Sequence, residues 1–305
     1  MASRSIKPVR LVSATVGPKK SHYSQYQLWR DLFPAARGAG ADGIELCFRG
    51  KLDKHRNIVS GPNLSAIEEV VEITYSEFDF VNLHLSAFMV PLLEYGLGYE
   101  FLDKFENVIC HLGYADNFIG HLEDKMVLDQ LEKILPKERK NKLLIENGSR
   151  PINNIRVINR IAQKHKLKKV FDIGHFIIGF YERNEESGAP HDKIANYLTC
   201  DSIDRVYLKD GLLNDLARGI KEIHVHYLWW QGSRAVDHYP PGRRMIRHKT
   251  GYRAVSEIIK RANPEIITLE HNHKKYNTVR YLKKAFEYTE KNFLGNKHGT
   301  KFFAR

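Results

Sequence analysis

The sequence predicts a single (β/α)8 TIM barrel, an α/β domain in which all strands are parallel. Short runs of β-branched and aliphatic residues recur along the chain, and several of them stop on a charged residue. Such runs are typical of buried parallel strands. Stretches with apolar residues three and four positions apart separate the runs, as expected for amphipathic helices. Repeated strand–helix alternation predicts a parallel sheet with crossover helices, and eight repeats predict closure into a barrel.

Eight candidate strands follow one another in chain order. They are residues 10–16, 43–48, 80–85, 107–112, 142–146, 169–173, 221–226 and 265–270. The fourth strand is ambiguous, because residues 98–119 would also fit a single helix.

Six intervals between the strands carry helical patterns. They are residues 22–38, 63–77, 122–135, 151–166, 251–262 and 276–292. Asn63 or Ser65 would cap the second of these helices. Two longer segments, 176–220 and 227–250, follow the sixth and seventh strands, where barrels build substrate-binding loops. We therefore expect one barrel domain over residues 1–294, followed by a basic tail over 295–305.

Composition narrows the class of protein. The 305 residues are 42% hydrophobic and lack a run long enough to cross a membrane. The N-terminus leads into a strand without a secretion signal, and the three cysteines form neither a zinc motif nor a disulfide framework. These features predict a cytoplasmic protein. The net charge of +12 favours anionic ligands, either small molecules or nucleic acid.

Four strand ends carry the residues that point to chemistry. Glu146, Asp172, His224 and Glu270 end or closely follow the runs KLLIENG, KVFDIGHF, KEIHVHY and EIITLEHNH. The carboxyl ends of parallel barrel strands meet at one face, which is where TIM barrels place their active sites. Carboxylates and imidazoles together suit a divalent metal ion.

Each of these residues also has a structural interpretation. Glu146 and Glu270 could form buried ion pairs with Arg or Lys, because a buried carboxylate needs a partner. Asp172 and His175 form a D-x-x-H pair that a capping Asp and an ordinary His would also explain. Their position beside other candidate ligands favours the functional interpretation.

Further histidines end other strands. His224 and His226 share one face of the seventh strand, and we favour His224 as the ligand and leave His226 open. His84 and His111 end the third and fourth strands, and a core histidine is the alternative interpretation of His111.

Taken in order, these residues resemble the xylose isomerase-like TIM-barrel superfamily, which includes sugar isomerases and epimerases, inosose dehydratases and endonuclease IV. FPAARGAGADGIEL (33–46) is similar to the family's entry into its second strand, and AVDHYPPGR (235–243) is similar to a stretch in its sugar-enzyme branches.

The resemblance implies a divalent-metal-dependent isomerase or epimerase acting on a sugar-like substrate, including phosphorylated ones. One manganese, magnesium or zinc ion would be held by Glu146, Asp172, His224 and Glu270. Glu146 and Glu270 would also move the substrate proton next to a carbonyl. The residues expected to contact the small anionic or polyol substrate are His84, His111, His175, His238 and Arg243. Barrels of this group often associate into homo-oligomers.

The alternative implied by the resemblance is a zinc-dependent abasic-site DNA endonuclease like endonuclease IV, with up to three zinc ions. His84, His111, Glu146, Asp172, His175, His224, His238 and Glu270 match its ligand pattern in order. An expected Asp is replaced by Val236, and the neighbouring Asp237 would point the other way on an extended segment. This departure favours the sugar enzyme. A third class, an inactive barrel serving as a binding subunit, would predict missing ligands.

Overall fold

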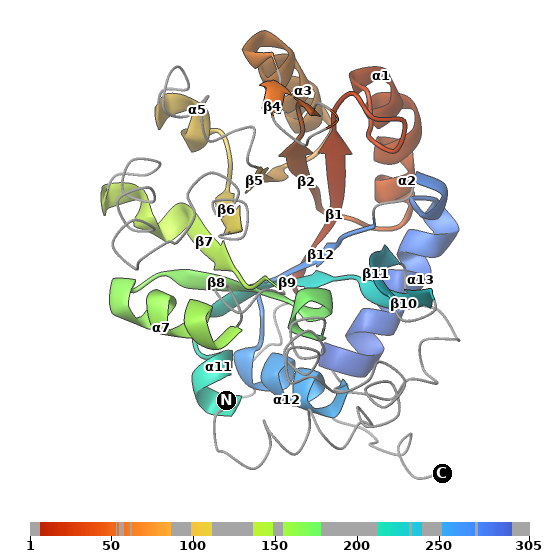
Figure 1. Ribbon diagram of the computed structural model, residues 1–305. Coiled ribbons are helices and arrows are strands. Elements are labelled where there is room, and N and C mark those ends of the chain that lie inside the picture. The colour runs from red at the N-terminus through yellow and green to blue at the C-terminus, as the bar shows by residue number, and fades with distance from the viewer. Residues whose placement is uncertain are drawn as a thin grey trace.

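The computed structural model describes residues 7–52, 54, 58–61, 63–86, 99–111, 137–148, 155–177, 213–231, 234–239, 252–271 and 274–294. Within these ranges the chain forms a closed (β/α)8 TIM barrel (Figure 1). The barrel order is β1-β12-β9-β8-β7-β6-β5-β2, and every neighbouring pair is parallel.

The barrel strands agree with the predicted ones to within one residue at either end. They are β1 (Val9–Val16), β2 (Gly43–Phe48), β5 (Phe80–Leu85), β6 (Asn107–His111), β7 (Leu143–Glu146), β8 (Lys168–Asp172), β9 (Ile220–Val225) and β12 (Ile266–Leu269). The ambiguous region at 98–119 contains both types of element, because the short helix α5 (Tyr99–Asp103) precedes β6.

Helices surround the barrel (Figure 1). The main ones are α3 (Leu64–Glu77), α7 (Ile155–His165), α12 (Tyr252–Ala262) and α13 (Val279–Thr289), with the shorter α11 (Leu213–Ala217). Asn63, not Ser65, caps α3, because its side chain accepts the backbone N–H of Ser65. The helix expected at 122–135 lies outside the described residues.

The helix predicted at 22–38 is continuous from Gln25 but not uniform. It consists of α1 (Gln25–Gln27), a π-helical turn η1 (Leu28–Leu32) and α2 (Phe33–Gly38). A capping box formed by Ser24 and Gln27 begins it. A second π-helical turn, η7 (Glu290–Leu294), continues α13.

The described part of the 227–250 segment consists of two strands. Strands β10 (Tyr227–Gln231) and β11 (Arg234–Tyr239) form an antiparallel hairpin there. A smaller hairpin joins β3 (Lys51–Leu52) to β4 (Ile58–Ser60) after β2. Two 3-10 turns, η3 (Lys137–Lys142) and η6 (Lys274–Tyr276), and a short helical segment at 173–177 are also described. None of the described helices is long and apolar enough to cross a membrane.

The main core lies between the outward faces of the strands and the surrounding helices. Leu46, Leu83, Ile145, Phe171 and Ile267 are among its fully buried members. A separate small cluster consists of Ile109, Leu144 and Val170. These three residues alternate with the outward-facing ones, so they fill part of the barrel interior. Apolar packing therefore holds the outward faces of the strands against the helices, and on β6, β7 and β8 the small inner cluster adds to it.

Candidate active site at the mouth of the barrel

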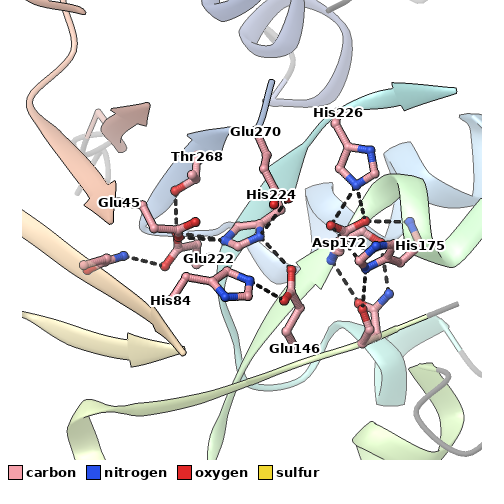
Figure 2. Close-up of polar contacts among 12 residues, drawn as sticks. Glu45, His84, Glu146, Asp172, His175, Glu222, His224, His226, Thr268 and Glu270 are labelled. Carbon is pink, nitrogen blue, oxygen red and sulfur yellow. Dashed lines mark hydrogen bonds and ion pairs between the residues drawn. The ribbon is translucent and has the colours of Figure 1, made fainter. Parts of the chain in front are cut away.

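The four predicted ligands converge at the carboxyl ends of their strands (Figure 2). Glu146 ends β7, Asp172 ends β8, His224 lies near the end of β9 and Glu270 follows β12. One ligand atom from each lies within 4.8 Å of the others. Two ligands about 2.2 Å from a shared ion are roughly 4.4 Å apart when they lie on opposite sides of it. The arrangement is therefore close to that of one coordination sphere.

His224 is at the centre of this group. Its Nδ1 atom lies 2.7 Å from Glu146 Oε1 and 3.5 Å from Glu270 Oε2. The shorter contact is not aligned as a hydrogen bond, so His224 Nδ1 and Glu146 Oε1 are buried atoms without a hydrogen-bond partner. Buried polar atoms normally have partners. A shared cation would satisfy both atoms at once.

The charges around His224 and Glu146 favour a positive charge between these two side chains. Burial by itself lowers the pKa of His224, but the charges of Glu45 and Glu146 outweigh burial, and the pKa lies well above its usual value. The pKa of Glu146 moves the other way. Burial raises it, and the charges of His224 and His84 bring it well below its usual value. The site therefore attracts a cation, either a proton or a metal ion.

His84 holds the other oxygen of Glu146. Its Nε2 atom lies 3.0 Å from Glu146 Oε2, and its Nδ1 atom lies 3.3 Å from the carbonyl oxygen of Leu85. His84 was predicted to contact substrate. In the structure it is buried and orients Glu146, and within the described residues the ion-pair partners of Glu146 are the histidines His84 and His224.

Asp172 is fixed by residues that directly follow β7 and β9. Asn147 receives the backbone N–H of Asp172 at 2.9 Å and donates to its carbonyl oxygen at 3.0 Å. The carboxylate accepts the backbone N–H of His175 at 2.6 Å and lies 2.8 and 2.9 Å from His226 Nε2. Asp172, His175 and His226 form a second group able to hold a metal ion.

His226 needs Gly174 beside it. A Cβ atom at Gly174 would lie 2.0 Å from His226 Cε1, well inside van der Waals contact. The absent side chain thus makes room for the imidazole that contacts Asp172. The sequence left His226 undecided, and the structure places it at the site.

Two buried carboxylates at the site were missed. Glu45 Oε2 lies 3.0 Å from His224 Nε2, and Glu222 Oε1 lies 3.4 Å from the same atom. Both side chains are fully buried. The available signal was an acid inside an apolar run, GIELCF for Glu45 and KEIHVHY for Glu222. An acid in the interior of a buried strand requires a partner just as one at its end does.

All five predicted substrate contacts stay predictions, and three of them have side chains outside the described part of the chain. His111 ends β6 beside Glu146 of β7 in the strand register, but the structure does not describe its side chain. The backbone of His238 lies in β11, and its side chain is likewise outside the described atoms. Arg243 lies outside the described residues.

Positive charge gathers at the same mouth, after β1, β2 and β12. His22 is partly buried, and its pKa is lowered to about 4, first by burial and then by the charges of Lys19, Arg49 and Lys274. The Nδ1 atom of His22 is buried without a hydrogen-bond partner. Gly17 permits this packing, because a Cβ atom there would lie 2.8 Å from that nitrogen. Lys19, Arg49 and Lys274 therefore form a cationic rim, which suits a ligand with an anionic group.

Comparisons with known proteins show no family for the chain. No protein-family model matches it, and no curated protein sequence matches it. A solved structure of SacUVDE is similar over 93% of this chain and 99% of its own, with 12% identity and a TM-score of 0.48. A dihydropteroate synthase of Yersinia pestis is similar over 94% of both chains, with 11% identity and a TM-score of 0.42. Likenesses this distant carry no argument about activity.

Proposed function

We propose that this protein is a divalent-metal-dependent isomerase or epimerase. Its substrate would be a sugar or sugar-like compound, including phosphorylated ones, and the reaction would begin with proton abstraction next to a carbonyl. The observation that carries the proposal is the convergence of Glu146, Asp172, His224 and Glu270 at the mouth of the barrel. Active sites of TIM barrels lie at this end.

The donor set fits a metal ion. Three carboxylates and one imidazole suit manganese, magnesium or zinc. The buried atoms Glu146 Oε1 and His224 Nδ1 lack hydrogen-bond partners, which agrees with a place for a cation between the ligands. When bound, such an ion supplies a Lewis acid that polarises the substrate's carbonyl or hydroxyl oxygen.

The acid–base pair would be Glu146 and Glu270. Strands β8 and β9 separate β7 from β12 in the barrel, so the two carboxylates approach His224 from different strands. Carboxylates on two sides of a substrate carbon could remove a proton and return one. Glu146 is buried, whereas the Glu270 side chain is 17% exposed, so their surroundings differ. Different surroundings are what give two carboxylates different protonation states.

Mutating either glutamate tests this proposal. Glu146→Gln and Glu270→Gln should each reduce turnover about 100- to 10,000-fold, because general acid–base groups contribute factors of that size. The measurement is deuterium uptake from solvent into a panel of hydroxy-carbonyl sugars, with circular dichroism to verify the fold. Glu290→Gln serves as control, because Glu290 pairs with Arg10 on the outside of the barrel, away from the proposed ligands. Full activity in either test variant would exclude the acid–base pair.

A second candidate is hydrolysis of a phosphodiester at a site with several metal ions, as in the endonuclease alternative. The observation that favours it is the second group, Asp172, His175 and His226, which shares Asp172 with the first. The cationic rim suits a phosphate backbone as well as a small anion.

Metal content separates these candidates. Elemental analysis of the purified chain should find about one divalent ion, lost in Glu146→Gln, if the isomerase proposal holds. Two or three zinc ions per chain would favour the nuclease, and cleavage of abasic-site DNA would then be measured. If the chain bound no metal even after reconstitution, the remaining interpretation would be an inactive barrel that serves as a binding subunit.

A further inference from the structure

The two ring nitrogens of His224 face different surroundings (Figure 2). Nδ1 faces the proposed ligands Glu146 and Glu270. Nε2 faces away from them, toward Glu45 at 3.0 Å and Glu222 at 3.4 Å. A neutral imidazole carries a proton on one nitrogen and a lone pair on the other. Which nitrogen can bind a metal ion is therefore set by the hydrogen bond that the other one makes.

Glu222 is held by other donors. Its Oε1 atom accepts the hydroxyl of Thr268, and its Oε2 atom accepts the amide of Asn82 at 2.9 Å. Asn82 in turn accepts the amide of Asn107, which accepts the ammonium group of Lys221. This chain of partners extends away from His224 and satisfies Glu222 without it.

Glu45 differs from Glu222, because its hydrogen bond is made with His224. Its Oε2 atom makes the 3.0 Å contact with His224 Nε2, and its Oε1 atom has no hydrogen-bond partner. The side chain is fully buried at the centre of β2, whose six residues are all buried. Burying a carboxylate that makes so few hydrogen bonds is unfavourable, so the hydrogen bond to His224 needs an explanation.

We propose that Glu45 is a positioning residue: it accepts the Nε2–H of His224 and so leaves the Nδ1 lone pair directed at Glu146, Asp172 and Glu270. Outer carboxylates of this kind fix the tautomer and the ring orientation of a metal-binding histidine. The proposal rests on the proposed metal site, since Glu45 acts only through His224. It adds a functional role to the second strand.

Metal affinity measures this role directly. The metal-free full-length protein is titrated with Zn²⁺ and with Mn²⁺ against a chelator of known affinity. Glu45→Gln should weaken binding about 10- to 100-fold, as loss of an outer partner of a metal ligand typically does. Glu45→Ala should weaken it further, because Gln still offers an amide oxygen to the Nε2–H. Glu290→Gln should bind as the unmodified protein does.

Glu222→Gln is the discriminating variant. Glu222 keeps its own partners, so this change should weaken metal binding less than Glu45→Gln does. A larger loss in Glu222→Gln would assign the positioning role to Glu222 and overturn the proposal. Loss of two ions per chain in Glu45→Gln would also overturn it, because Glu45, His84 and His224 would then form a metal site of their own.

A second measurement needs no change at Glu45. In protein loaded with Zn²⁺ and labelled with ¹⁵N-histidine, nitrogen chemical shifts report which ring atom of His224 carries the proton, with the signal assigned by its loss in His224→Gln. We expect a proton on Nε2 and none on Nδ1. The opposite tautomer would overturn the proposal even if Glu45→Gln failed to fold. Failure of the metal site itself would appear differently, as absence of Zn²⁺ and Mn²⁺ binding by the unmodified protein.

Discussion

The two sides of the barrel interior differ in chemistry. On β6, β7 and β8 the interior includes a small apolar cluster, Ile109, Leu144 and Val170. On β2, β5, β9 and β12 it is polar and equally buried, and the residues there are Glu45, Asn82, Glu222 and Thr268. TIM-barrel interiors are usually filled with branched apolar side chains. The polar side is thus the departure that requires a reason.

The difference indicates a division of tasks. The apolar side supports the strands that deliver Glu146 and Asp172, and it contributes stability through packing. The polar side lies against His224 Nε2 and sets the orientation of that ring. A buried polar group stabilises a fold only when its partners are present. Stability and site geometry should therefore respond differently to substitutions on the two sides.

Leu144→Ala should produce the largest change in stability. Leu144 is fully buried in the apolar cluster, and truncation of such a leucine costs about 2–5 kcal/mol because of lost burial and the cavity left behind. Urea denaturation measures the free energy of unfolding. A loss below about 1 kcal/mol would mean that the apolar side is not close-packed.

Thr268→Val should have a smaller effect on the polar side. The change keeps the shape but removes the hydroxyl that donates to Glu222, leaving a buried acceptor short of one partner at about 1–3 kcal/mol. Thr74→Val in α3 is the matched control. Its hydroxyl only back-bonds to the Val70 carbonyl at 2.7 Å within the helix, so its loss should matter less. If the two variants lost equal free energy of unfolding, the hydrogen bond to Glu222 would not differ in importance from the one within the helix.

A third buried group, Lys169, lies on the outward face of β8. Its Nζ atom donates to Asn159 Oδ1 and to the Leu216 carbonyl, both at 2.7 Å. Burial is the main cause that lowers the pKa of Lys169 to about 7 from 10.5. Between these two values the unfolded chain binds more protons than the folded one, so stability should rise with pH.

The slope attributable to Lys169 is at most about 1.4 kcal/mol per pH unit. Urea denaturation at pH 7, 8 and 9 measures it. Lys169→Met should remove this rise while keeping the rest of the pH profile. An unchanged slope in the variant would show that Lys169 stays charged when it is buried.

The fold was predictable because its signal is local. Eight apolar runs gave the barrel strands to within one residue, since each run must be buried whatever surrounds it. The hairpin of β10 and β11 was not predicted, because its pairing joins two segments within a stretch that resembles a loop. The π-helical turn η1 inside the 22–38 helix was likewise missed, since its apolar spacing matches that of an ordinary helix.

The candidate site was predictable in part for the same reason. Glu146, Asp172, His224 and Glu270 were identified because parallel strands in a barrel must bring their carboxyl ends together. Their grouping within 4.8 Å agrees with that expectation. Glu45 escaped notice because it lies in mid-strand, and its partner His224 is 179 residues away in the chain.

The sequence by itself determined the barrel, the end at which its polar residues gather, and the types of ligand atom on offer. These follow from the alternation of side chains and from burial, which act along a single strand. Only the tertiary structure decided which nitrogen of His224 faces Glu146, that Glu45 contacts the other, and that Gly174 admits His226 beside Asp172. Those contacts depend on the register between strands and on ångström-scale packing, which no local pattern encodes.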